Sequence, residues 1–116
     1  NIGPVNTKHI SSLYNQVDGL LMPTLLETYG LPYIEAFHNN KPVFTSDIDF
    51  ARAVCSDAAK YFNPFDELDI LEKMEIGFNN ENEIKKMISK GHVQLKKIIS
   101  WKGVFKKYQR LILKEQ

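Results

Sequence analysis

Short apolar runs alternate with amphipathic stretches along the first 80 residues of the chain. The apolar runs have strand length and are bordered by turn residues, and they predict strands at 19–22, 42–46 and 59–62. Apolar spacings of three and four predict helices over 8–16, 32–39 and about 49–55, and from Pro64 and Asp66 onwards. Strands that alternate with helices are typical of βαβ units, and continuously apolar strands are typical of a parallel sheet that is buried on both faces. The predicted fold class is therefore α/β.

Two further amphipathic helices are expected after residue 80. The first carries an apolar stripe, with Gly91 as an expected weak point. Ser100 is expected to cap the second helix, and Asn6 or Thr7 the first helix of the chain. The apolar residues behind the last three predicted helices are Leu68, Leu71, Met74 and Phe78; Ile84, Met87, Ile88, Leu95 and Ile98; and Trp101, Phe105, Tyr108, Leu111 and Ile112. We divide the chain into a sheet-containing part, 1–80, and carboxyl-terminal helices, 81–116. Three strands are too few for an independent doubly wound domain, so the sheet is expected to be half of a larger one.

Charge is distributed unevenly along the chain. Residues 1–83 carry five Lys/Arg and thirteen Asp/Glu, a net charge of −8, whereas residues 84–116 carry ten Lys/Arg and one Glu, a net charge of +9. A basic tail of this kind fits an anionic surface such as a membrane, but the solvated face of a helix is the preferred interpretation. Aromatic residues interleaved with base-reading side chains are not evident, so we expect no nucleic-acid partner.

Composition narrows the remaining classes. The one cysteine, Cys55, excludes an internal disulfide and is expected to be a buried thiol in a reducing, cytoplasmic compartment. No apolar run has the length of a membrane span, and no His/Cys/Asp cluster has the spacing of a metal site. The first residues, "NIGPV", resemble the end of a strand or loop, so we expect the chain to be part of a longer protein.

The stretch between the first two strands contains two glutamates, Glu27 and Glu35, eight residues apart. In open α/β sheets ligands bind beyond the carboxyl ends of strands, where Glu27 lies. Gly30 permits a close backbone approach, and the helix starting at Pro32 directs free N–H groups towards an anion such as a diphosphate. Glu27 would accept hydrogen bonds from sugar hydroxyls, and Glu35, in the first helical turn, would hold a ribose diol. A solvent-facing Glu27 and a Glu35 that only complements the helix dipole fit the same residues.

The motif itself resembles a known family. The sequence "PTLLETYGLPYIEAFHNNKPV" resembles the Pro-Ser-x-x-Glu-Gly-Phe-Gly-Leu-Pro-x-x-Glu-Ala-x-x-x-Gly-x-Pro-Val pattern of GT-B glycosyltransferases of family 4. The resemblance extends from Gly3 to Asp66, with a weaker echo at Ser100-Trp101. It implies the carboxyl-terminal half of a Rossmann-like donor domain, in a protein with an amino-terminal domain upstream.

The resemblance also implies an activity. Members of this family transfer a sugar from a nucleotide-sugar donor, such as a UDP- or GDP-sugar, to a saccharide or lipid-linked acceptor, with retention of configuration. They usually need no divalent metal, and no cofactor is expected. Glu27 is implied to face the donor sugar as the catalytic residue, and Glu35 to hold the ribose. Thr28, Tyr29, Gly30 and Leu31 are implied to contact the sugar or diphosphate. Polysaccharide or glycolipid biosynthesis is the implied setting, in the cytoplasm or peripherally at the inner membrane face.

Several features depart from the family pattern. Thr28 stands where a glycine is usual, Asn40 replaces the glycine after the helix, and Ala53 precedes Val54 where the family has a glutamate. The basic residues that neutralise the diphosphate lie upstream in the family, so we expect the fragment alone to be inactive.

The last helix crosses back to the amino-terminal domain in the family, so here its bare face is expected to favour a homodimer. A non-catalytic scaffold with a degenerate site and a GT-B nucleotide-sugar epimerase are the alternative functions.

Overall fold

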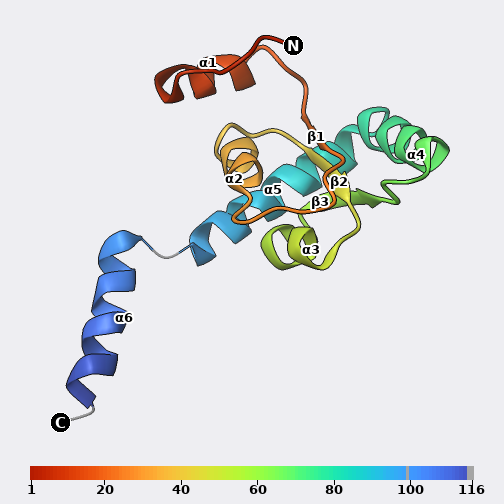
Figure 1. The fold of residues 1–116 in the computed structure, drawn as a ribbon. Coiled ribbons are helices and arrows are strands. Elements are labelled where there is room, and N and C mark those ends of the chain that lie inside the picture. Colours follow the sequence, from red (N-terminus) through yellow and green to blue (C-terminus); the bar gives the residue numbers. More distant parts are fainter. Residues whose placement is uncertain (99, 115–116) are drawn as a thin grey trace.

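The computed structural model describes residues 1–98 and 100–114. At its centre lies a parallel sheet with the strand order β1-β2-β3, formed by β1 (Leu20–Met22), β2 (Val43–Ser46) and β3 (Ala59–Phe62) (Figure 1). Val43 pairs with Leu20 on one side and with Ala59 on the other. The predicted α/β class, a partial Rossmann-like parallel sheet with flanking helices, is confirmed.

The helical segments follow the predicted order with small differences at their ends. They are η1 (Thr7–His9), α1 (Ile10–Tyr14), α2 (Leu31–His38), α3 (Asp49–Cys55), α4 (Glu67–Phe78), α5 (Glu81–Lys97) and α6 (Trp101–Lys114). The single helix predicted over 8–16 is instead a 3₁₀ turn followed by a five-residue α-helix. The Asn6 side chain caps the turn by accepting a hydrogen bond from the Lys8 N–H, 3.0 Å away. The predicted cap is therefore present, and it caps a tighter helix than expected.

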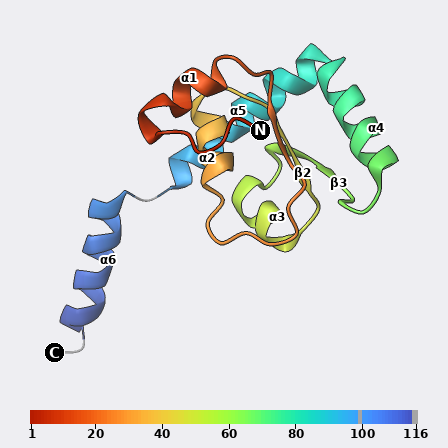
Figure 2. The same ribbon diagram turned by 45° about the horizontal axis from the view of Figure 1, so that its top comes forward.

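The two faces of the sheet are covered by different helices. Alternate residues of a strand point to opposite faces, so Val43 lies in a cluster with residues of α1, α2 and α3, while Phe44 packs with residues of α4 and α5. Figure 2 shows α4 on the side of the strands opposite α2 and α3. The continuous apolar character of β2 follows from this arrangement, since every residue of the strand is buried.

Gly91 lies inside α5, and the helix continues through it without a break. The expectation that this glycine weakens the helix misses its role in packing. A Cβ atom added at Gly91 would lie 2.5 Å from Cδ1 of Phe37, on α2. The missing side chain therefore lets α5 approach α2 closely enough for the Phe37 ring to fill the space between them.

Only part of the apolar surface of α4 is packed. Met74 and Phe78 contact the cluster around Phe44, but Leu68 and Leu71 are 73% and 53% exposed. Ile70 completes the partly buried stripe, because residues four apart share one side of a helix. The helix touches the sheet through this stripe, so the leucines near its start remain at the surface.

Helix α6 extends away from the rest of the molecule (Figure 1). Ser100 caps it as predicted, since the Ser100 hydroxyl accepts a hydrogen bond from the Gly103 N–H, 3.3 Å away. The predicted apolar face is exposed from Trp101 to Ile112, with Trp101 at 88%. Within residues 1–98 and 100–114, no helix is long and apolar enough to cross a membrane.

Cys55 is a free, buried thiol at the end of α3, as predicted. It packs in the cluster that includes Tyr33 and Val43. Burial raises the pKa of the thiol to about 12. Cys55 is therefore protonated at neutral pH and has a packing role.

Candidate functional site

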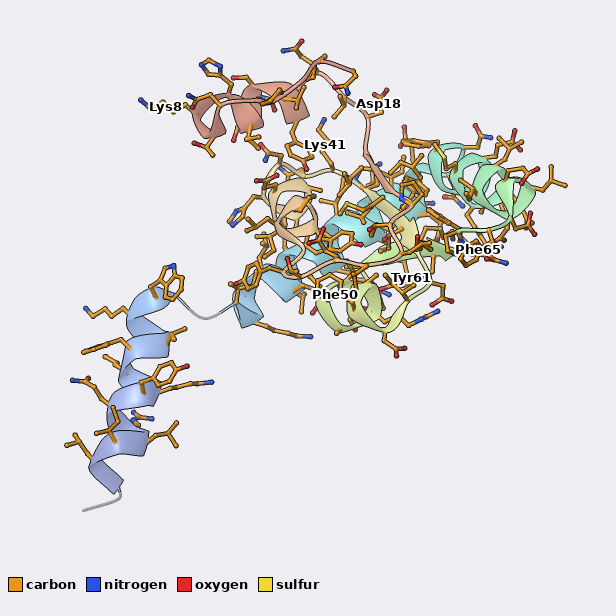
Figure 3. All side chains as sticks on the ribbon, viewed as in Figure 1. Lys8, Asp18, Lys41, Phe50, Tyr61 and Phe65 are labelled. Atoms are coloured by element: carbon orange, nitrogen blue, oxygen red, sulfur yellow. The ribbon has the colours of Figure 1, made fainter. Side chains whose placement is uncertain are left out.

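The loop between β1 and α2 lies beyond the carboxyl end of β1, the side of a parallel sheet on which ligands bind. Within the loop, the Thr24 hydroxyl donates a hydrogen bond to the Leu26 carbonyl, 2.8 Å away. Phe50 of α3 lies beside the end of the loop (Figure 3), close to Gly30. The loop is thus held between the strand tip and two helices.

Gly30 is the N-cap residue of α2, where the loop ends and the helix begins. Its φ angle is +72°, a left-handed conformation that residues with a Cβ atom rarely adopt. A Cβ atom here would also lie 2.7 Å from Cδ2 of Tyr33 and 3.1 Å from the Phe50 ring. Both the backbone and the packing against Tyr33 and Phe50 therefore require glycine, and the close approach to a ligand that the sequence suggested stays a prediction.

Helix α2 begins at Leu31, one residue before the proline at which the sequence placed its start. Pro32 still fits, since the first turn of a helix has no use for its N–H group. As a consequence, Glu35 lies in the second turn and not in the first turn as predicted, and the first turn has no acidic residue. Glu35 therefore does not act as the acid that complements the helix dipole.

A buried chain of hydroxyl groups fixes the start of α2 to the strand tips. The Thr45 hydroxyl donates to the Met22 carbonyl at 3.2 Å and lies 2.8 Å from the Tyr33 hydroxyl. Because threonine has one hydroxyl proton, Tyr33 must be the donor to Thr45. Tyr33 and Thr45 are fully buried, so the network sets the position of the loop between β1 and α2. Sequence reasoning missed both residues; the one available signal was a polar threonine inside an apolar strand.

Glu27 is partly buried and bonded to its own loop. Its Oε1 atom accepts a hydrogen bond from the Thr28 N–H at 2.7 Å and one from the Thr28 hydroxyl at 3.3 Å. The Thr28 N–H, with smaller contributions from the N–H groups of Tyr29 and Gly30 and against some desolvation, holds the pKa of Glu27 below its usual value. Its charge also raises the pKa of Tyr33, after burial as the main cause. Glu27 is therefore an ionised acceptor next to the start of α2.

Glu35 has a different environment from Glu27. Burial, and secondly the charge of Glu35, raises the pKa of Tyr14 on α1 to about 12, and the Tyr14 hydroxyl donates to the Pro32 carbonyl at 3.1 Å. Tyr33 and Glu35 are two residues apart, about 200° around the helix, so they point in nearly opposite directions. The two carboxylates thus have different surroundings: Glu27 is bonded to Thr28 within the loop, and Glu35 lies on α2 close enough to influence Tyr14 of α1.

Two open grooves lie on either side of the loop. One, of about 490 Å³, lies at the carboxyl ends of β2 and β3, and the other, of about 670 Å³, lies against the start of α6. Exposed Tyr29 and Leu31 line the second groove, and exposed Leu25 lines the first. The loop therefore presents exposed side chains to both grooves.

An ion pair lies at the first groove, where Asp47 of the lining is bonded to Arg52. The Arg52 guanidinium donates to both carboxylate oxygens of Asp47, at 2.5 and 2.7 Å, and lies 4.3 Å from the centre of the Tyr61 ring. Figure 3 shows Tyr61 at the strand ends and Phe65 beyond β3. Within the described residues, no three His, Cys, Asp or Glu side chains come together as a metal ion would need. The lining of this groove consists mainly of apolar side chains and of charged side chains held in ion pairs, such as Asp47 with Arg52 and Asp69 with Lys73.

The chain is similar in sequence to known proteins. The model of the family described as glycosyl transferases group 1 matches residues 2–94, most of the chain. The O-antigen chain mannosyltransferase RfbU of Salmonella typhimurium (strain LT2) is 38% identical over 63 residues, 54% of this chain and 18% of that protein. The chain thus spans about a fifth of the length of this relative. No solved structure matches. The chain belongs to the glycosyl transferases group 1 family.

Proposed function

We propose that the chain is the carboxyl-terminal half of the donor domain of a retaining GT-B glycosyltransferase of family 4. The full-length protein transfers a sugar from a UDP- or GDP-sugar to a saccharide or lipid-linked acceptor. One observation carries this proposal: in a chain of this family, an ionised Glu27 lies in the loop that follows β1, held by the N–H groups that lead into the N-terminus of α2. A carboxylate matches the hydroxyls of a sugar, and a helix N-terminus matches a diphosphate.

The loop residues take separate roles in this proposal. Glu27 accepts hydrogen bonds from the donor sugar, and Glu35 holds the ribose. The backbone N–H groups of Tyr29, Gly30 and Leu31 face the sugar or the diphosphate. Separate roles are compatible with the different surroundings of the two glutamates, one bonded to Thr28 and one whose charge acts on Tyr14.

The proposed reaction needs no side-chain nucleophile. In a front-face transfer, the acceptor hydroxyl attacks the anomeric carbon from the side on which the diphosphate leaves. The bond from that carbon to the phosphate oxygen breaks, a bond to the acceptor oxygen forms, and the acceptor proton passes to the departing diphosphate. Glu27 contributes as an acceptor for the sugar hydroxyls and retains its negative charge throughout.

The location and the partners are further parts of the proposal. The relative is an O-antigen chain mannosyltransferase, which supports polysaccharide biosynthesis with a saccharide or lipid-linked acceptor. We place the protein in the cytoplasm, with peripheral contact at the inner membrane face as the alternative. An amino-terminal domain, absent from this chain, covers the exposed apolar face of α6. Without that domain, the same face leads the fragment to form homodimers.

A donor panel assayed with the full-length protein tests the proposed function. Incubation with UDP- and GDP-sugars and a lipid-linked saccharide should give a glycosylated product with one of the donors, with the anomeric configuration preserved. Interconversion of the nucleotide sugar without transfer would identify an epimerase. No reaction and no binding with any donor would identify a scaffold, and either result would overturn the proposal.

The 116-residue chain alone is expected to bind nucleotide sugars weakly or not detectably. Residues 1–83 have a net charge of −8 and repel a diphosphate at long range, and Arg52 is already paired with Asp47. Isothermal titration calorimetry with UDP- and GDP-sugars measures this directly. A micromolar dissociation constant for the isolated chain would contradict the expectation.

A further inference from the structure

We propose that Thr28 is a positioning residue for Glu27: its N–H and its hydroxyl together hold one carboxylate oxygen, so that the other oxygen is directed to the donor. The inference rests on the proposed function for the identity of the donor, but the positioning itself rests on the geometry of the loop. Both hydrogen bonds end on Oε1 of Glu27, at 2.7 Å from the N–H and 3.3 Å from the hydroxyl. Among the described residues both bonds of Glu27 within hydrogen-bond distance use Oε1, which leaves lone pairs of Oε2 for a ligand hydroxyl.

The hydroxyl adds a constraint that a backbone group alone does not supply. A glutamate side chain rotates about several bonds and loses conformational entropy when it is fixed. One N–H bond restrains the distance of Oε1 from the backbone, and a second donor on the same atom restrains the position of Oε1 further. Threonine suits this task because its branched Cβ leaves few side-chain rotamers, so the hydroxyl is itself held in place.

The hydroxyl is a property of this sequence and not of the motif that it resembles. Glycine is usual at this position in the pattern, and glycine supplies an N–H but no hydroxyl. Thr28 is exposed on the loop, so its side chain is not needed to fill the core. The hydrogen bond from its hydroxyl to Glu27 is therefore the structural effect of having threonine at this position.

The two donors also favour the ionised form of Glu27, which is the form that the proposed role uses. Thr28 acts on the carboxylate through both groups, and each of them favours the ionised state and lowers the pKa. An ionised carboxylate accepts hydrogen bonds at both oxygens, so the sugar hydroxyl meets an acceptor at neutral pH. Loss of the Thr28 hydroxyl should raise the pKa of Glu27 and loosen the carboxylate at once.

Two substitutions separate the hydroxyl from the shape of the side chain. Thr28→Val keeps the N–H and the branched shape but removes the hydroxyl, and Thr28→Ser restores the hydroxyl. In the 116-residue chain, titration of the Glu27 carboxyl by ¹³C NMR should show an upward shift of the pKa in Thr28→Val and a return towards the original value in Thr28→Ser. In the full-length enzyme, Thr28→Val should lower kcat/KM by about tenfold, the scale of one hydrogen bond to a charged group.

A second loop threonine provides the matched control. The Thr24 hydroxyl donates to the Leu26 carbonyl and not to Glu27, so Thr24→Val should leave the pKa of Glu27 unchanged. An unchanged pKa in Thr28→Val, or a Thr28→Ser variant that behaves like Thr28→Val, would overturn the positioning role. A pKa shift with rescue by serine supports it even if the full-length protein transfers no sugar, in which case the proposed function alone fails.

Discussion

Replacing Glu27 with glutamine in the full-length protein is expected to lower kcat by two to three orders of magnitude. Glutamine preserves the shape of the side chain but removes the negative charge that accepts the hydroxyls of the donor. Loss of one preorganised group that acts on the transition state typically costs about 10²- to 10³-fold in kcat. Initial rates at saturating donor and acceptor measure the effect, with circular dichroism to verify the fold.

Glu75→Gln is the matched control for this substitution. Glu75 is an exposed residue of α4 and does not line the groove that Leu25 of the loop shares with Asp69 and Lys73 of that helix, so the same loss of charge there should leave kcat unchanged. A Glu27→Gln enzyme with wild-type turnover would contradict the role of Glu27. Equal losses in both variants would assign the effect to overall charge instead.

Gly91→Ala is expected to destabilise the chain, although alanine is the better helix former. Propensity alone favours alanine over glycine by about 1 kcal/mol in a helix interior. The new methyl group would lie 2.5 Å from Cδ1 of Phe37, which is 2% exposed and cannot swing into solvent. Overpacking of a core costs typically about 1–3 kcal/mol, so the free energy of unfolding should fall. Urea denaturation followed by circular dichroism measures the change.

Two further substitutions test whether the contact with Phe37 causes the loss of stability in Gly91→Ala. Ser89→Ala is the control on the same helix, and Phe37→Leu removes part of the contact. Ser89 is exposed on the same helix, so alanine there should leave the stability nearly unchanged or raise it slightly. In a Phe37→Leu background the methyl group at position 91 has more room, and the cost of Gly91→Ala should shrink. A Gly91→Ala chain more stable than the original would show that propensity outweighs the contact with Phe37.

The strands and helices were predictable because their signals are local. Each strand is a short apolar run bordered by turn residues, and Pro32, Asp66 and Ser100 mark helix starts within the chain itself. The position of the candidate site followed from the same reading, because a loop after a parallel strand lies at the binding side of the sheet. The positions of Glu27 and Gly30 in this loop could therefore be predicted from the sequence.

Contacts between distant segments could not be predicted in this way. The role of Gly91 depends on Phe37, fifty-four positions earlier, and the burial of Thr45 depends on Tyr33 and Met22. Local propensity treats Gly91 as a weakness and Thr45 as an ordinary strand residue. The contact of Glu27 with Thr28 is local, but its direction depends on how the loop is held between β1 and α2. The assignment of donor-contacting residues remains a prediction from the motif.

Hydrogen–deuterium exchange of the full-length protein, with and without its nucleotide-sugar donor, tests most directly the central claim that the donor binds at the loop between β1 and α2. Slower amide exchange in the donor complex should be concentrated at residues 27–31 and in the first turn of α2. Unchanged exchange across residues 24–35, with protection elsewhere in the protein, would contradict the account.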